Sequence, residues 1–178
     1  MGSSSPAATG RADWQTFADD APDLARAVRA RFEAFRHHVL ATLRADGSPR
    51  ASGSEVDFWR REATLGSMVN ARKALDLLRD PRCAVHSNPG PGTDMALGDA
   101  RLTGHAIEAS EETRAAYIAE RHPPEPLHLF LLELTEVTLT WLDGENIMAA
   151  TWRPSGVTAY ARPPEGEPRR LTEFTVPG

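Results

Sequence analysis

The chain has 178 residues, of which 40% are hydrophobic, and this length and composition fit one domain with a packed core. Its formal net charge of −5 argues against a general nucleic-acid or acidic-membrane binder, which would need a basic surface. The single cysteine, Cys83, excludes a disulfide within the chain, and no apolar run approaches the ~20 residues that span a bilayer. We therefore expect a cytoplasmic protein that binds neither nucleic acid nor membrane.

The N-terminal third predicts a lead-in, a helix and a meander of strands. Residues 1–12 lack the features of a signal peptide and are expected to be disordered. Apolar residues recur at three- and four-residue steps over 13–35, which predicts a helix. A hairpin turn is expected at Asp46 and Gly47. Three antiparallel strands are expected at residues 39–44, 49–58 and 62–67.

The middle and end of the chain alternate between short helices and strands. A helix is predicted over 70–79, with Asn70 as its N-cap and Pro81 just beyond its end. A second short helix is predicted over 111–123, and two strands in near succession over 127–143. Further strands are expected at residues 82–88, 100–110 and 147–154, with one more possible strand after them. The loop around 89–99 is too rich in proline and glycine for regular structure.

These elements predict a mainly β domain with short peripheral helices. Strands that recur every ~8–12 residues favour an antiparallel barrel or sandwich over a doubly wound parallel sheet. We place this domain, with its N-terminal helix, at residues 13–162. Residues 163–178 are rich in proline and are expected to form a C-terminal arm.

The opening of the predicted 70–79 helix carries two adjacent cations, Arg72 and Lys73. Lys73 is the only lysine of a chain whose other basic residues are arginines. Cations in the first turn of a helix oppose its dipole, and acidic residues would be the stabilising choice there. The arrangement is explained if a bound anion lies at the helix start, where free backbone N–H groups and the Ser67 hydroxyl can add hydrogen bonds. A solvated helix face is the alternative that the sequence leaves open.

Arg50 and Ser52 add a weaker signal to this anion site. They are two residues apart on a predicted strand and so share one face of it. A strand that starts with arginine and is paired by a hairpin can present this side chain along the same rim as the helix start. On their own, these two residues would identify no ligand.

Three segments together carry a resemblance to a known family: "VLATLRADGSPRASGSEVDF", "LGSMVNARKALDLLRDPRCAVHS" and "GDARLTGHAIEAS". They resemble the pyridoxamine 5′-phosphate oxidase-like flavoproteins, over about residues 30–153. The resemblance implies a six-stranded antiparallel split β-barrel that works as a homodimer, with the cofactor in a groove between protomers. It implies that the phosphate is held by Ser67, Arg72 and Lys73. It also implies that the rim strand from Arg50 to Ser54 lines the site, with Arg50, Ser52 and Gly53 as cofactor-binding residues. It also implies that Trp152 and Arg153 reach the cofactor across the dimer.

The function implied by the resemblance is flavin-type oxidoreduction on a small organic substrate. The chain lacks the closely spaced arginine and histidine that bind substrate near the end of true pyridoxamine-phosphate oxidases, because Arg169 and Arg170 have no such partner. FMN is the expected cofactor, with the deazaflavin coenzyme F420 as the alternative. Met68, Val69 and Trp152 are candidates for apolar contact with the ring.

The sequence identifies neither a catalytic residue nor a metal site. The chemistry of a flavin belongs to the cofactor, and the protein supplies position and electrostatics, so no side-chain acid or base is required. No spacing of histidine, cysteine and aspartate matches a zinc or iron site. A non-catalytic flavin-binding module, such as a sensor or a storage protein, shares the same phosphate site and remains the alternative function.

Overall fold

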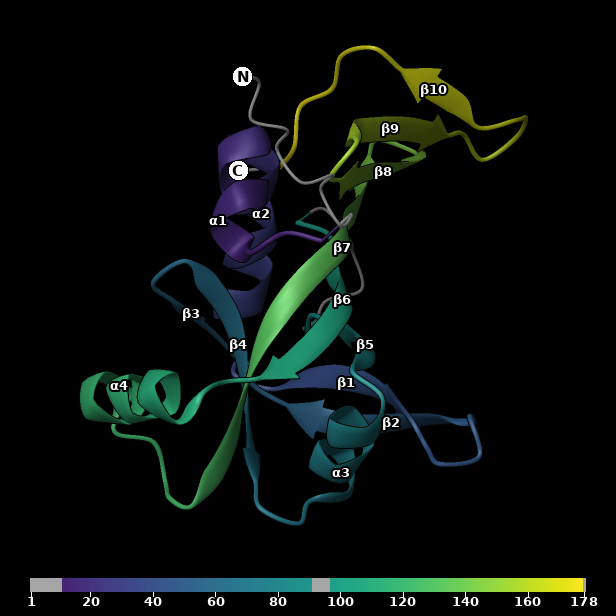
Figure 1. Cartoon of the computed structure of the whole chain (residues 1–178). Coiled ribbons are helices and arrows are strands. Elements are labelled where there is room, and N and C mark those ends of the chain that lie inside the picture. Colours follow the sequence, from purple (N-terminus) through teal and green to yellow (C-terminus); the bar gives the residue numbers. More distant parts are fainter. Residues whose placement is uncertain (1–10, 91–96, 178) are drawn as a thin grey trace, which may run out of the picture.

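The computed structural model describes residues 11–90 and 97–177, which form four helices and ten strands (Figure 1). The helices are α1 (Trp14–Asp20), α2 (Pro22–Glu33), α3 (Arg72–Arg79) and α4 (Glu111–Arg121). The strands are β1 (His38–Leu43), β2 (Pro49–Ser54), β3 (Val56–Trp59), β4 (Glu62–Met68), β5 (Arg82–His86), β6 (Asp99–Glu108), β7 (Leu127–Asp143), β8 (Asn146–Arg153), β9 (Gly156–Arg162) and β10 (Arg169–Leu171). In this part of the chain no helix is long and apolar enough to cross a membrane.

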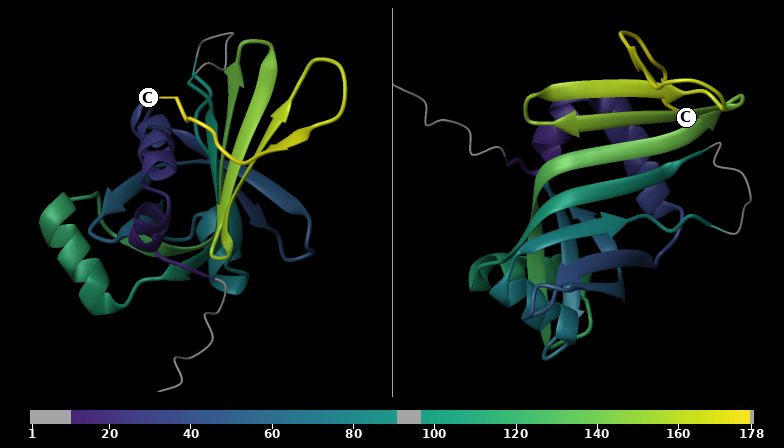
Figure 2. Two further views of the ribbon diagram at one scale, coloured as in Figure 1. Left: turned by 90° about the horizontal axis from the view of Figure 1, so that it is seen from above. Right: turned by 90° about the vertical axis from the view of Figure 1, so that its right-hand side faces the viewer.

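One antiparallel sheet contains all ten strands, in the order β10-β9-β8-β7-β6-β5-β1-β2, with β4 paired to β7 and β3 to β4. β7 pairs with β6 along one edge and shares its other edge between two strands: residues 127–131 pair with β4, and residues 137–143 pair with β8. Within the described ranges no ladder joins β2 to β4, so the sheet curls without closing (Figure 2). This is the split β-barrel expected from the sequence, with an opening between β2 and β4.

The ladder between β6 and β7 shifts register at Thr103 and Gly104, where β7 carries one extra residue, Thr135. A Cβ atom at Gly104 would lie 2.0 Å from the carbonyl oxygen of Glu133, which is closer than any real side chain approaches. Glycine is therefore required here because the two backbones pass so close together.

The core lies on the inner face of this sheet, under α1, α2 and α3. Trp152 and Phe17 are fully buried with ring centroids 5.0 Å apart, which joins β8 to α1. Ala74 and Leu77 bury one face of α3. The largest fully buried side chains are Trp152, Phe17, Phe32, Phe130, Leu40, Leu65, Leu102, Leu129, Leu134, Leu139, Val28 and Val85. Most of them alternate with outward-facing residues along their strands, as a half-buried sheet requires.

Four sequence expectations need correction. The helix expected over 13–35 is two helices, because Pro22 cannot donate the hydrogen bond that would continue α1. The strand expected over 49–58 ends at Ser54 and resumes as β3. The two strands expected over 127–143 are one, β7, which continues without a turn and has β4 and then β8 as neighbours along one edge. The N-cap of α3 is Ala71, whereas Asn70 has a positive φ of 65° and makes no cap.

The C-terminal arm is more ordered than its proline content suggests. β10 pairs with β9, and the partly buried Leu171 and Val176 pack on the core. The segment then returns beside α1 and α2 (Figure 1). There Phe174 and Val176 line a hollow with residues of α2. Most of the predicted lead-in (1–10) and the middle of the predicted loop (91–96) lie outside the described residues.

Candidate functional site

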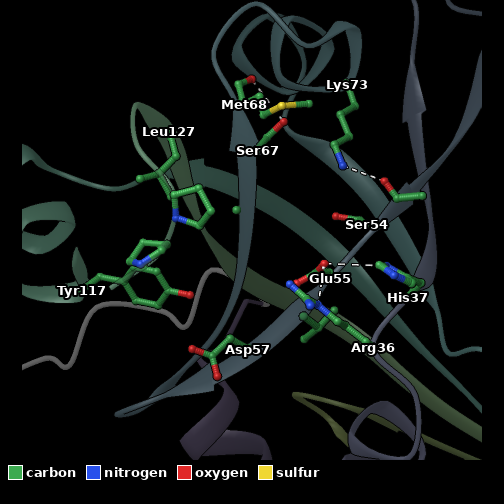
Figure 3. Close-up of a pocket in the computed structure, with 15 residues that line it drawn as sticks. Arg36, His37, Ser54, Glu55, Asp57, Ser67, Met68, Lys73, Tyr117 and Leu127 are labelled. Atoms are coloured by element: carbon green, nitrogen blue, oxygen red, sulfur yellow. Dashed lines mark hydrogen bonds and ion pairs between the residues drawn. The ribbon is translucent and has the colours of Figure 1, made fainter. Parts of the chain in front are cut away.

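A cavity of about 360 Å³ lies at the opening between β2 and β4 (Figure 3). At this point β2 and the end of β4 face each other without a strand between them. Backbone and side-chain groups of both strands therefore face the same space. Its walls come from the loop before β1, from β2 and β3, from the end of β4, from α3 and from α4 with the segment after it. The lining residues are Arg36, His37, Gly53, Ser54, Glu55, Val56, Asp57, Gly66, Ser67, Met68, Lys73, Tyr117, Pro123, Pro124 and Leu127.

Lys73 supplies a cation to this cavity from the second residue of α3. Its Nζ donates a hydrogen bond to the carbonyl oxygen of Gly53, 2.6 Å away, and so reaches from the helix to the edge of β2. Burial lowers the pKa of the Lys73 ammonium below its usual range, and the carboxylate of Glu55 offsets part of this effect. The hydrogen-bond partner is a neutral carbonyl, so most of the positive charge remains uncompensated at the cavity wall.

The start of α3 and the end of β4 add hydrogen-bonding groups beside Lys73. The N-cap, Ala71, offers no side-chain acceptor, so the N–H groups of the first helical turn face the rim without a side-chain cap. Ser67 is buried, and its Oγ has one long contact of 3.5 Å to the carbonyl of Met68. Met68 itself is 77% exposed, which is unusual for a large apolar side chain in a core-forming strand. An anionic ligand would therefore find both donors and apolar surface at this end.

Ser54 holds an unused polar group at the same cavity. The residue is 4% exposed, and its Oγ has no hydrogen-bond partner among the described residues. In Figure 3 the hydroxyl lies between Lys73 and the centre of the cavity. A buried hydroxyl without a partner costs stability, and such groups are uncommon in folded proteins unless a water, ion or ligand satisfies them. Ser54 thus fits a site that holds a polar ligand.

The opposite wall of the cavity is formed by α4 and the proline segment after it (Figure 3). Tyr117 is buried on α4, and burial raises the pKa of its phenol, with the charge of Asp57 acting in the same direction. Asp57 is paired with Arg121 at 2.9 Å, which ties α4 to β3. Pro124 and Leu127 complete an apolar surface that can contact a flat ring. At the rim, Arg36 pairs with Glu55 at 2.9 Å.

The residue before Lys73 lies on the other flank of α3. Arg72 lines a second hollow, of about 400 Å³, together with Arg50 and the buried Asp76, and this hollow shares no lining residue with the cavity. Arg50 Nε donates to Asp76 at 2.6 Å, so its charge is largely compensated. Two cations that are adjacent in the sequence therefore stand in two different electrostatic environments.

The structure brings together half of the predicted cofactor-binding residues. Gly53, Ser67, Met68 and Lys73 line the cavity, whereas Arg50 and Arg72 line the hollow. Ser52 is half-buried on the inner face of β2 and lines neither.

Trp152 is not at the site. It has no exposed surface, packs on Phe17, and donates its Nε1–H to Asp20 at 3.2 Å, so the cofactor contact expected of it does not hold within this chain. Its size and aromatic character, which suggested a ring contact, instead fill the core between β8 and α1. Arg153, its neighbour, points to the outer face and pairs with Glu136.

Sequence reasoning missed the α4 wall, whereas Ser54 ends the strand that the resemblance placed at the rim of the site. Tyr117 and Asp57 lie 60 residues apart, and only the pairing of β3 and β4 under α4 brings them to one cavity. No local motif marks either residue. Among the described residues no group of histidine, cysteine and acidic side chains is placed to hold a metal ion.

Comparison with solved structures identifies proteins of the same architecture. A pyridoxamine 5′-phosphate oxidase-related, FMN-binding protein from Nostoc punctiforme matches with a TM-score of 0.57 and 18% identity, over 81% of this chain and 96% of that one. PhzG from Burkholderia lata, solved with tetrahydrophenazine-1-carboxylic acid, matches with a TM-score of 0.51 and 13% identity, over 85% and 89%. A protein of unknown function from Agrobacterium tumefaciens matches with a TM-score of 0.54 and 22% identity, over 73% of this chain and 58% of that one.

These likenesses establish the fold. The chain has the split β-barrel of the pyridoxamine 5′-phosphate oxidase-like proteins, as its three sequence segments suggested. Neither a family model nor a curated protein matches the sequence. The identities are too low to transfer an activity, so function has to be argued from the cavity itself.

Proposed function

We propose that this protein binds a phosphate-bearing flavin-type cofactor, FMN or the deazaflavin F420, in the cavity between β2 and β4, and acts as an oxidoreductase on a small organic substrate. The observation that carries the proposal is Lys73, a cation at an uncapped helix start whose one hydrogen bond goes to a neutral carbonyl. An anion at this point gains the ammonium charge and the N–H groups of the first turn together. The FMN-binding neighbour of the same fold gives independent support.

The residues of the cavity fit both parts of such a cofactor. Lys73, Ser67 and the backbone of the α3 start can hold a phosphate, and the Ser54 hydroxyl can bond a polar chain or ring edge. Met68 and Leu127 offer apolar surface for a ring. The bound cofactor supplies the hydride or electron transfer, and the protein's residues bind it, orient it and exclude water. Lys73 can exchange its hydrogen bond to the Gly53 carbonyl for one to the phosphate without a movement of the backbone.

A homodimer belongs to this proposal, because a partner would complete an open groove. The outer face of β2, β1 and β5 presents small and apolar residues to solvent, and on it Val39 is 47% exposed with Ala41, Ala51 and Ala84 around it. Such a flat apolar face suits a second copy of the same sheet. We expect a dimer in sedimentation velocity, and Val39→Glu should shift it to monomer. A protein that sediments as a monomer with cofactor bound would contradict this part.

The binding test compares ligands that differ in the phosphate alone. We expect FMN to bind the protein about tenfold to a hundredfold more tightly than riboflavin, which follows from the range for hydrogen bonds to charged groups. Titration with F420 then decides between the two cofactors. Equal affinity for FMN and riboflavin would contradict a phosphate grip. Catalysis is tested separately, by following whether protein-bound reduced cofactor passes its electrons to an acceptor faster than free cofactor does; failure there would leave the non-catalytic flavin-binding module.

A further inference from the structure

One buried histidine has no role in the proposed cofactor site. His38 opens β1 and is 3% exposed, and its ring packs against that of Phe32 in α2, with the ring centroids 4.9 Å apart. Polar groups that are buried to this extent are hydrogen-bonded in folded proteins, and the partners of an imidazole determine which of its nitrogens carries the proton. The contacts of His38 therefore reveal its protonation state.

The Nδ1 atom of His38 accepts a hydrogen bond from the segment that follows β5. The donor is the backbone N–H of Asn88, at 3.2 Å. The Asn88 side chain donates from Nδ2 to the carbonyl oxygen of His37 at 3.0 Å, and its Oδ1 accepts from the N–H of Gly90 at 2.8 Å. A Cβ atom at Gly90 would lie 3.0 Å from the ring of Phe35, so the segment packs closely on the connection before β1. Because a backbone N–H can only donate, Nδ1 carries no proton while this bond exists, and the ring is neutral.

The bond to Asn88 makes this contact sensitive to pH. An imidazolium donates from both nitrogens, so a proton on Nδ1 would set two donors against each other and break the bond. Burial lowers the pKa of the His38 imidazole below its usual value of 6.5, and a hydrogen bond with the backbone of Phe32 offsets part of this effect. The ionisable side chains that act on the ring are His37, whose charge lowers the pKa further, and Glu55, whose charge raises it.

The residues around His38 belong to the wall of the cofactor cavity. Arg36 and His37, which directly precede it, line the cavity, and so does the uncharged Ser54, which pairs with His38 in the β1–β2 ladder (Figure 3). The bond from Asn88 to His38 and the bond from its side chain to the His37 carbonyl therefore tie the segment after β5 to one side of the cavity rim.

We propose that His38 is a pH-sensitive clamp, which holds residues 88–90 against the cavity rim when its ring is neutral and releases them when the ring takes up a proton on Nδ1. The proton comes from solvent, and the change breaks hydrogen bonds only. The rim at Arg36 and His37 is then fixed near neutral pH and free to move in acid. The clamp needs no bound ligand, so it does not depend on the cofactor proposal.

The test is an NMR titration of the whole protein, without cofactor, from neutral pH into acid. We expect the His38 ring to titrate at a pH below 6.5, and the backbone and side-chain amide signals of Asn88 and the amide signal of Gly90 to move with the same midpoint. The Asn88 amide proton should shift upfield, as the loss of its hydrogen bond requires. The proposal is wrong if the ring titrates while these amide signals stay in place, if it titrates at or above 6.5, or if it stays neutral until the protein unfolds.

His38→Asn separates the contact from its proton. The amide oxygen of asparagine can accept from the Asn88 N–H in place of Nδ1 but takes up no proton in this range, so the Asn88 and Gly90 signals should keep their neutral-pH positions in acid. The matched control is His122→Asn, at the exposed left-handed cap of α4, a conformation that asparagine also adopts. It should leave the common midpoint unchanged. If His122→Asn removes the pH dependence as His38→Asn does, the transition is not a property of His38 and the proposal fails. The wild-type titration decides the question even if His38→Asn does not fold.

Discussion

The two flanks of α3 use their basic residues in different ways. On one flank Lys73 donates its hydrogen bond to a neutral carbonyl, so its charge is available to a ligand in the cavity. On the other flank Arg50 and Arg79 both donate to the buried carboxylate of Asp76, which compensates most of their charge within the protein. The comparison teaches that Arg72 and Lys73, adjacent in the sequence, need not serve one anion. Each of the following experiments tests whether the two flanks of α3 have separate roles.

The largest effect is expected at Asp76. Asp76→Ala should lower the free energy of unfolding by about 3–5 kcal/mol, because it leaves Arg50 and Thr42 without their shared acceptor beneath the hairpin. Chemical denaturation measures the loss. The matched control is Asp80→Ala, at the end of the same helix, where the carboxylate is only half-buried and pairs with Arg82, so a smaller loss is expected.

The pH dependence of stability gives Asp76 a signature of its own. Burial alone would raise the pKa of Asp76, but hydrogen bonds from Arg50, Thr42 and Arg79 together hold it below its usual range. Since its pKa is lower in the folded chain than in the unfolded one, its contribution is fully present above the unfolded value of 3.8 and is lost as the pH falls through the folded value. The difference between wild type and Asp76→Ala should therefore shrink below pH 3.8. A difference that stays constant down to strong acid would show that packing, and not the ionised carboxylate, accounts for the effect.

The next effect is expected on cofactor affinity. Lys73→Ala should weaken FMN binding by about 1.5–3 kcal/mol and leave riboflavin binding nearly unchanged, since the lost partner is the phosphate. The free energy of unfolding should change little, because the substitution removes only one hydrogen bond, to Gly53 at the surface of the cavity. Arg72→Gln should weaken FMN less than Lys73→Ala does. Equal losses would show that one anion lies across the helix start and that the two flanks act together.

The smallest effect is expected at Ser54. Ser54→Ala should leave the stability of the cofactor-free protein unchanged or raise it by up to about 1 kcal/mol, because the hydroxyl it removes has no partner. Ser87→Ala is the matched control, since Ser87 is fully buried and its Oγ accepts from the Ala100 N–H at 2.9 Å. Thermal unfolding of both variants measures the contrast, and equal losses would mean that the Ser54 hydroxyl is hydrogen-bonded in solution.

Much of the fold could be predicted from local pattern. The Asp46–Gly47 hairpin, with Gly47 at φ 81°, and the 62–68 strand lie where turn chemistry and alternation placed them. The pairing of residues 127–143 as one strand could not be predicted, because two partners on one edge, β4 and β8, determine it. Pattern identifies a strand, but tertiary neighbours decide how long it runs.

The site was predictable where one segment builds it and not where several meet. Ser67, Met68 and Lys73 belong to one β4–α3 connection, and the structure places them in one cavity. Arg50 was expected beside them, but the carboxylate that draws it to the other flank, Asp76, carries no local signal. Trp152 was assigned through the family resemblance, and its burial depends on α1, more than 130 residues earlier. Long-range packing of this kind leaves no trace in spacing.

Gly104 limits how this chain can evolve. At Gly104 the backbones of the neighbouring strands β6 and β7 leave no room for a Cβ atom, so every substitution there must push the Glu133 carbonyl and its strand aside. β7 is the one strand that belongs to both the barrel and the C-terminal meander, and a displacement at its centre would reach both halves at once. At this position the packing of two strands therefore tolerates glycine alone.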